Sequence, residues 1–297
     1  MAEKAKAKKG KKVGTLIIIG GHEKDGDQEI LKTVAERVGS GKLVICTVAT
    51  TEPAESFKEY RKIFQGLGVK RVEQLDIRIR EEGYADKVVS VLDGATVVFF
   101  TGGDQLKITS QLGDSRVYQR VQEIFESGGT IAGTSAGASV MSETMLISGA
   151  SDESHKLGSV LGMAPGLGLI HDVVIDQHFA ERGRLGRLLA AITQNPRTLG
   201  VGIDENTAVV VTDGDFFEVV GEGAVTVLDG SKVSYSNLAD DKEQMDKTLS
   251  VFDVKLHMLS AGNRFDLRDR RPAMPPKPEE EAEAKTGERE KVEVGGR

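Results

Sequence analysis

Short apolar segments alternate with amphipathic ones along the first half of this chain, and this alternation constrains the fold more than any other feature. Five apolar runs between residues 13 and 132 have the length and composition of strands, and the segments between them have helical spacing. Strands that alternate with helices form right-handed βαβ units. We therefore predict an α/β fold with a mostly parallel central sheet and helices on both faces. The predicted strands are 13–20, 42–49, 71–77, 96–100 and 128–132, and the predicted helices are 29–38, 52–67, 84–92 and 117–126.

The pattern changes after about residue 209, where four short apolar runs are joined by Asp-Gly or Glu-Gly pairs. Such pairs favour tight turns between antiparallel strands. We predict a C-terminal β-meander that extends the same domain, so that residues 13–268 form a single α/β catalytic domain. The runs are 209–212, 216–220, 224–228 and 232–235.

Both ends of the chain have a composition typical of disorder. Residues 1–12 are rich in lysine, alanine and glycine, and residues 269–297 are rich in proline and glutamate. Their apolar residues are too sparse to offset the entropy lost on ordering. We predict a disordered basic arm and a disordered Pro/Glu-rich tail.

Composition excludes several classes of protein. The net charge of −7 argues against a nucleic-acid partner. No apolar stretch approaches the roughly 18 residues that a membrane span requires, and no signal-peptide pattern follows the basic N-terminus. The single cysteine, Cys46, lies in an apolar run and suits a reducing compartment. We predict a cytoplasmic protein without a membrane partner.

Residues 133–137 spell G-x-S-x-G where a predicted strand meets the start of a helix. In such a strand–turn–helix the serine hydroxyl is held on a sharp turn near the positive end of the helix. A glycine-rich chain can produce this motif by chance. However, three glycine-rich turns follow predicted strands, at 20–21, 102–103 and 133–137, and the carboxyl ends of parallel strands share one edge of the sheet. We therefore predict Ser135 as a nucleophile.

A serine nucleophile needs a base, and the base needs an orienting carboxylate. His178 is the strongest of five histidines because it ends the predicted strand 172–178 at the same edge, before a predicted helix 179–192. His22, which follows the turn 20–21, is the second candidate. Three carboxylates could orient the base. They are Glu205, Asp204 and Asp176.

The turn 102–103 supplies the remaining part of a hydrolytic site. One of its backbone amides, which we assign to Gly103, and the amide of Ala136 would form an oxyanion hole. The histidines are scattered, and the sequence contains neither H-E-x-x-H nor C-x-x-C, so we predict no metal. G-x-G-x-x-G is also missing, and we predict no cofactor.

Three arginines follow His178 closely, at 182, 184 and 187. Guanidinium forks match carboxylates bidentately, so a substrate with free carboxylates would explain the cluster. A solvated ion-pair face with Glu181 is the alternative.

Four motifs, in the same order along the chain, resemble those of the cyanophycinases, serine peptidases of the peptidase E-like group. The resemblance extends over about residues 14–267 and implies a peptidase E-like fold, related to class I glutamine amidotransferase domains, in a homodimer. The motifs are Phe99-Phe100-Thr101-Gly102-Gly103-Asp104-Gln105, residues 133–139, Asp176-Gln177-His178-Phe179 with residues 182–188, and Gly202-Ile203-Asp204-Glu205.

The resemblance implies exo-type hydrolysis of cyanophycin (multi-L-arginyl-poly-L-aspartate) to β-Asp-Arg dipeptides. It makes Ser135 the nucleophile, His178 the base and Glu205 the orienting acid. It also implies a set of residues that line the substrate pocket. Two alternatives remain, an aspartyl or isoaspartyl dipeptidase of the peptidase E type and a catalytically silent peptide-binding relative. The implied pocket residues are Gln105, Asp176, Gln177, Arg184 and Arg187.

Overall fold

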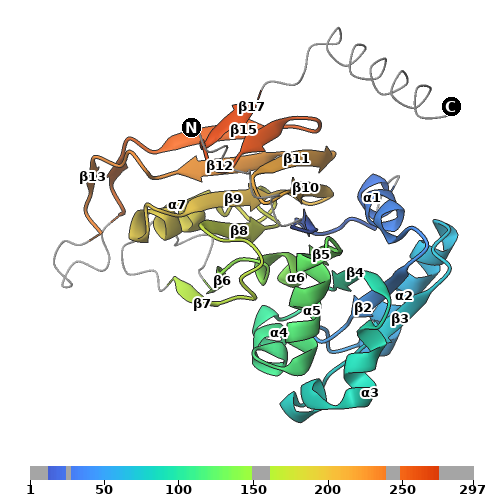
Figure 1. The fold of residues 1–297 in the computed structure, drawn as a ribbon. Helices are drawn as coiled ribbons and strands as arrows, with labels where there is room; N and C mark the ends of the chain where they lie inside the picture. The colour runs from blue at the N-terminus through green and yellow to red at the C-terminus, as the bar shows by residue number, and fades with distance from the viewer. Residues whose placement is uncertain (1–12, 25–27, 149–160, 239–247, 274–297) are drawn as a thin grey trace, which may run out of the picture.

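A nine-stranded sheet crosses the middle of the molecule in the computed structural model, which describes residues 13–24, 28–148, 161–238 and 248–273 (Figure 1). One half of this sheet is parallel and has the order β1-β5-β4-β2-β3. Its strands are buried on both faces near the centre, which explains their continuous apolar character. The strands are β1 (Thr15–Ile19), β2 (Lys42–Cys46), β3 (Val72–Leu75), β4 (Ala95–Phe100) and β5 (Thr130–Thr134).

Helices cover both faces of the parallel half, so the predicted α/β class is confirmed (Figure 1). Alternation along β1 shows how: Leu16 and Ile18 join the core beneath α5, whereas Ile17 and Ile19 join the core beneath α1 and α2. The first face carries α3 (Asp86–Val89), α4 (Gln105–Leu112) and α5 (Arg116–Glu126), and the second carries α1 (Glu29–Val38) and α2 (Pro53–Gly66).

Two helical segments on the α5 face differ from the prediction. The predicted helix 84–92 is divided into η1 (Arg80–Tyr84), α3 and η2 (Ser90–Leu92). Helix α4 was not predicted, because its start depends on a local cap rather than on a long apolar stripe. The Oδ1 atom of Asp104 accepts a hydrogen bond of 2.9 Å from the amide of Leu106.

The other half of the central sheet is antiparallel, and a second sheet of four strands packs beside it. Three of the four predicted C-terminal strands are present, but they are divided between the two sheets. Of the predicted run 232–235 only Tyr235 lies in a strand, which belongs to a separate two-stranded pair. The chain leaves β11 at Gly221, whose φ is 106°, and the next strand pairs with β9 instead. The central sheet continues with β10 (Thr207–Thr212), β11 (Phe216–Gly221), β16 (Arg264–Asp266) and β17 (Arg271–Ala273), and the second sheet contains β8 (Val173–Gln177), β9 (Leu199–Ile203), β12 (Val225–Asp229) and β15 (Lys255–Leu259).

The second sheet shares its core with the α5 face of the central sheet, and α7 (Leu185–Gln194) covers its outer side (Figure 1). The helix was predicted from residue 179. It begins later because Gly183 has a φ of 57° and the preceding residues form turns. Five short elements complete the described chain. They are α6 (Ala136–Ser139), the pair β6 (Thr144–Ser148) and β7 (Gly162–Pro165), and the pair β13 (Tyr235–Ser236) and β14 (Val251–Phe252).

The predicted boundary at residue 268 is five residues short. Strand β17 pairs with β16, and Arg270 donates a hydrogen bond of 3.0 Å to Asp229. The ordered domain therefore extends through Ala273. The predicted disordered arm, 1–12, and the remainder of the predicted tail, 274–297, lie outside the described residues.

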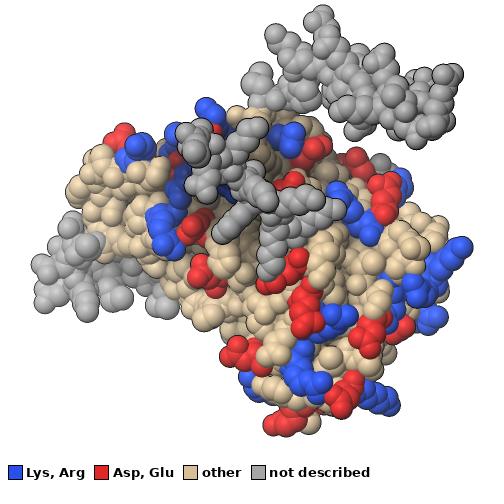
Figure 2. Space-filling model, viewed as in Figure 1, with Lys and Arg blue, Asp and Glu red and all other residues tan. Residues whose placement is uncertain are grey.

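The helices, the surface charge and the single cysteine bear on the predicted type of protein. In the described part of the chain, none of the helices combines the length and the apolar character that a bilayer crossing requires. On the face shown in Figure 2, Lys and Arg side chains are interspersed with Asp and Glu side chains. Cys46 is buried, and its burial raises the pKa of the thiol to about 12, so this thiol is protonated and unreactive at neutral pH.

Candidate active site

Ser135 lies on the sharp turn between β5 and α6, as the sequence motif predicted. Its backbone has φ 52° and ψ −110°, a conformation that a residue with a Cβ atom rarely adopts. The glycines of the motif are needed for space. A Cβ atom at Gly133 would lie 2.4 Å from the carbonyl oxygen of Gly137, and one at Gly137 would lie 2.3 Å from that of Phe100.

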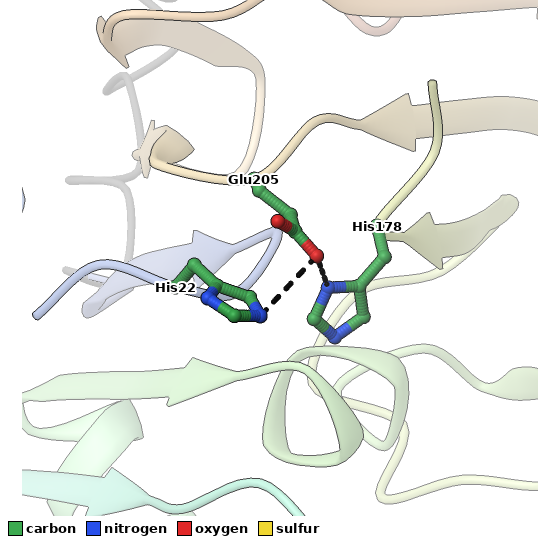
Figure 3. A group of neighbouring side chains, drawn as sticks. All are labelled: His22, His178 and Glu205. Atoms are coloured by element: carbon green, nitrogen blue, oxygen red, sulfur yellow. Dashed lines mark hydrogen bonds and ion pairs between the residues drawn. The ribbon is translucent and has the colours of Figure 1, made fainter. Parts of the chain in front are cut away.

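The structure brings together the three residues that the resemblance assigned to a catalytic triad, Ser135, His178 and Glu205. The hydroxyl of Ser135 lies 2.9 Å from Nε2 of His178. On the other side of the ring, Nδ1 lies 2.6 Å from Oε1 of Glu205 (Figure 3). A carboxylate can only accept, so Nδ1 carries the proton and Nε2 is left to accept from the hydroxyl. This is the tautomer that a general base requires.

The other two candidate carboxylates have different partners. Asp204 accepts hydrogen bonds from the backbone amides of Ala180, at 3.0 Å, and Ala224, at 3.1 Å. It therefore ties together two loops. Asp176 is fully buried against Arg184 and Arg187. Of the three carboxylates, only Glu205 contacts His178 within the described residues.

The turn after β1 connects all three segments of this site. Three successive carbonyl oxygens, at residues 19–21, each accept one backbone hydrogen bond from a different segment. The turn therefore fixes the spacing of segments that are far apart in the sequence. The pairs are Ser135 with Ile19 at 3.1 Å, His178 with Gly20 at 2.9 Å and Asn206 with Gly21 at 2.7 Å.

His178 is 5% exposed, and burial lowers its pKa below the usual 6.5. The hydrogen bond to Glu205 opposes this shift, whereas the positive charges of Arg182 and Arg184 add to it. The imidazole is therefore neutral at neutral pH, which is the form that can accept a proton.

The glycine turn after β4 faces Ser135. A Cβ atom at Gly102 would lie 3.4 Å from the Cβ atom of Ser135, and one at Gly103 would lie 2.3 Å from the carbonyl oxygen of Ala49. Among the described residues, neither the amide of Gly103 nor that of Ala136 donates a backbone hydrogen bond. Their assignment as an oxyanion hole stays a prediction.

Three of the residues predicted to line the substrate pocket form a buried cluster behind His178, which we call the arginine cluster: Asp176, Arg184 and Arg187. Arg187 donates from Nε to Asp176 at 3.0 Å and makes a second, closer contact from Nη2. Arg184 donates from Nη1 to Asp176 at 3.2 Å and to the side chain of Gln177 at 2.9 Å. Burial lowers the pKa of Arg184 to about 10, and the group stays charged.

Contact between the arginine cluster and a substrate stays a prediction, as does contact through Gln105 and Gln177. Gln105 is half-buried and donates to the carbonyl oxygen of Leu146 at 3.0 Å, and Gln177 donates to the hydroxyl of Ser139 at 3.3 Å. The exposed arginine beside the site is Arg182. The alternative of a solvated ion-pair face does not fit Arg184 and Arg187, because both are buried.

Sequence reasoning missed Glu23. This carboxylate is 1% exposed and accepts hydrogen bonds of 2.5 Å from the hydroxyl groups of Tyr60 and Thr134. It thus fastens the turn after β1 to the residue that precedes Ser135. The sequence signal was only its position directly after Gly20-Gly21-His22, and nothing there distinguishes a buried glutamate from an exposed one.

Sequence reasoning also judged the histidines too scattered for a metal set, and the structure corrects that reason. His22, the second candidate base, enters this site through Glu205. Its Nε2 atom lies 3.4 Å from Oε1 of Glu205. One ligand atom each from His22, His178 and Glu205 lies within 4.8 Å of the other two (Figure 3).

Comparison with known proteins identifies the family of this chain. The model of peptidase family S51 matches residues 16–219. The chain is 39% identical over 262 residues to the cyanophycinase of Nostoc sp., covering 87% of each chain. It is 36% identical over 260 residues to the cyanophycinase of Geminocystis herdmanii, covering 86% of this chain and 94% of the relative.

A solved structure shows the same fold. A peptidase from an acI-B1 Actinobacterium superposes with a TM-score of 0.64 at 23% identity, covering 87% of this chain and 98% of the other. The chain therefore belongs to peptidase family S51 and is a serine-type peptidase. The predicted α/β fold and the resemblance to cyanophycinases are confirmed.

Proposed function

We propose that this chain is an exopeptidase that hydrolyses cyanophycin to β-Asp-Arg dipeptides through Ser135, His178 and Glu205. The observation that carries the proposal is the continuous hydrogen-bonded chain from the Ser135 hydroxyl through His178 to Glu205, at 2.9 and 2.6 Å. The cyanophycinases to which the chain is 36–39% identical support the choice of substrate.

In the proposed reaction, Oγ of Ser135 attacks the scissile carbonyl carbon while Nε2 of His178 takes the hydroxyl proton. Glu205 holds the resulting imidazolium through Nδ1. The amides of Gly103 and Ala136 would donate to the oxyanion. His178 then protonates the leaving amine, and a water molecule activated by the same imidazole hydrolyses the acyl-enzyme, which restores Ser135.

The substrate presents an unusual backbone, because each aspartate carries an arginine on its β-carboxyl group. A site for this polymer has to recognise carboxylates and guanidinium groups together. Arg182 is exposed and close enough to His178 to lower its pKa, so its guanidinium fork is available for a substrate carboxylate. The buried arginine cluster would support this surface from behind.

Two further proposals follow from the resemblance and the composition. We infer that the chain acts as a homodimer, which light scattering coupled to size-exclusion chromatography would test. We also infer a cytoplasmic location, because the one cysteine is a buried free thiol. Detection of this protein in the extracellular fraction of its source cells would contradict that location.

The function is tested by adding the protein to a suspension of insoluble cyanophycin. We expect the turbidity to fall and mass spectrometry to detect β-Asp-Arg dipeptides, with no clearing by the matched variant Ser135→Ala. Hydrolysis of aspartyl or isoaspartyl dipeptides, without clearing of the cyanophycin suspension, would show a dipeptidase of the peptidase E type. Inactivity on both substrates would show a silent relative.

A further inference from the structure

His22 brings a second imidazole to the carboxylate of Glu205. Figure 3 shows the rings of His22 and His178 on either side of that carboxylate. The ring centroids are 5.7 Å apart and the rings are nearly perpendicular, at 80°. Nε2 of His22 and Nδ1 of His178 both contact Oε1 of Glu205, and one ligand atom from each of the three residues lies within 4.8 Å of the other two. The triad alone does not use His22.

Two imidazole nitrogens and one carboxylate oxygen form a donor set that suits a four-coordinate Zn²⁺ with water as its fourth ligand. Zinc bonds of about 2.0–2.2 Å place neighbouring tetrahedral donors roughly 3.3 Å apart. The distance of 3.4 Å between His22 and Glu205 already fits this geometry. The distance of 2.6 Å between His178 and Glu205 has to widen when an ion enters.

We propose that His22, His178 and Glu205 form an inhibitory site for Zn²⁺ or a related transition-metal ion. In the metal-free enzyme, Nδ1 of His178 carries the proton that it donates to Glu205. A metal at Nδ1 replaces that proton, which moves to Nε2. The ring then carries a proton on the nitrogen that faces Ser135 and cannot accept another. A triad histidine in the wrong tautomer loses about 10⁴-fold in kcat, so the metal-bound enzyme is switched off.

The exposed fractions of the three side chains indicate the order in which an ion would meet them. The His22 side chain is 59% exposed, Glu205 is 26% exposed and His178 only 6%. An ion therefore meets His22 first and reaches His178 last. Mg²⁺ and Ca²⁺ prefer oxygen ligands, so we expect neither of them to occupy this site.

Direct binding tests the site without any assumption about the substrate. The titration of ZnCl₂ into Ser135→Ala is followed by calorimetry, and Co²⁺ is added separately to detect the absorption of a tetrahedral site. The test variant adds His22→Asn, because His22 has a φ of 56° and asparagine tolerates this region. The matched control adds His171→Asn. That histidine lies 3.4 Å from Glu143, an exposed pair of the same composition outside the three-ligand group.

We expect one Zn²⁺ per chain in Ser135→Ala. The affinity should fall at least about tenfold with His22→Asn and stay unchanged with His171→Asn, since even residues that only support metal ligands contribute about 10–100-fold. Equal affinity in all three proteins would overturn the site. So would a loss of affinity that His171→Asn reproduces.

The inhibition rests on the proposed function and is measured separately. Turnover of cyanophycin by the wild type should stop with ZnCl₂, return with EDTA and be unaffected by MgCl₂. Relative to its own metal-free rate, His22→Asn should need at least about tenfold more zinc. Full turnover by zinc-loaded wild type, or equal zinc sensitivity of His22→Asn, would show that the ion does not inhibit through this site. A lack of cyanophycin hydrolysis in metal-free wild type would contradict the function while leaving the binding result intact.

Discussion

The proposed triad and the arginine cluster each take a residue from the end of β8, His178 and Asp176, yet the two groups are built in opposite ways. Asp176 is sealed, and its carboxylate is saturated by two guanidinium groups. His178 directly follows the same strand in a left-handed conformation, with a φ of 48°, and its ring contacts a half-buried serine. Satisfied charges hold a structure in place, whereas the buried ring of His178 is hydrogen-bonded on both sides to partly exposed groups, Ser135 and Glu205.

If this contrast is correct, Ser135→Ala abolishes catalysis and leaves stability unchanged. We expect kcat/KM to fall by about 10³-fold or more, as in other serine triads. The melting temperature should not fall, because alanine fits the turn. Calorimetry provides the control on folding. Near wild-type turnover would remove Ser135 from the mechanism.

The next largest effect separates the two acids that follow β9. Glu205→Gln should lower kcat by about 10²- to 10⁴-fold, because the amide no longer fixes the tautomer of His178. Asp204→Asn should leave kcat nearly unchanged and lower stability by about 1 kcal/mol, because one of its two backbone hydrogen bonds is lost. The reverse ranking of kcat values would transfer the orienting role to Asp204.

Arg187→Ala tests the other side of the comparison. If the arginines bound the substrate, as the sequence predicts, their alanine variants would raise KM more than they disturb folding. The structure changes this expectation, because Arg187 is buried against a fully buried carboxylate. Removing one partner of a buried pair destabilises a protein by about 3–5 kcal/mol. Lysine should not restore stability, since it lacks the planar fork. Unfolding in urea measures the loss, and unchanged stability would contradict the structural role.

The smallest expected effect is a shift in pH dependence. The rate requires neutral His178, whose pKa is lowered mainly by burial. Activity is therefore present above that pKa and lost as the pH falls through it, at a value below 6.5. Removing Glu205 deletes the hydrogen bond that raises the pKa, so the residual activity of Glu205→Gln should persist to lower pH. A plot of kcat/KM against pH measures both midpoints, and a wild-type midpoint above 6.5 would contradict burial as the dominant cause.

The parallel half of the fold could be predicted because its information is local. Strands buried on both faces have continuous apolar runs, and the helices between them have apolar residues along one face. The antiparallel part could not be assigned to two sheets from sequence. The run that became β12 can pair with β9 or β11 equally well by its pattern, and only the packing of the second sheet on the α5 face decides.

The candidate site shows the same division. Ser135 and His178 could be proposed from sequence because each follows a buried strand in a recognisable way. Glu205 and Asp204 could not be separated by strand alternation, because both lie beyond the end of β9, in a loop. Glu23 was missed because one of its two partners, Thr134, comes from a segment more than a hundred residues away. His22 was predicted only as an alternative base, because its contact with the distant Glu205 cannot be read from the sequence.

The backbone at Ser135 has a consequence for protein engineering. Its φ of 52° with ψ −110° carries a steric cost for any residue with a Cβ atom, and glycine escapes that cost. A library screened only for thermal resistance would therefore enrich glycine at this position, and the surviving molecules would lack the hydroxyl on which the proposed reaction depends. Thermal stability and catalytic turnover favour different residues at this position. Directed evolution of this chain therefore has to select for both properties together.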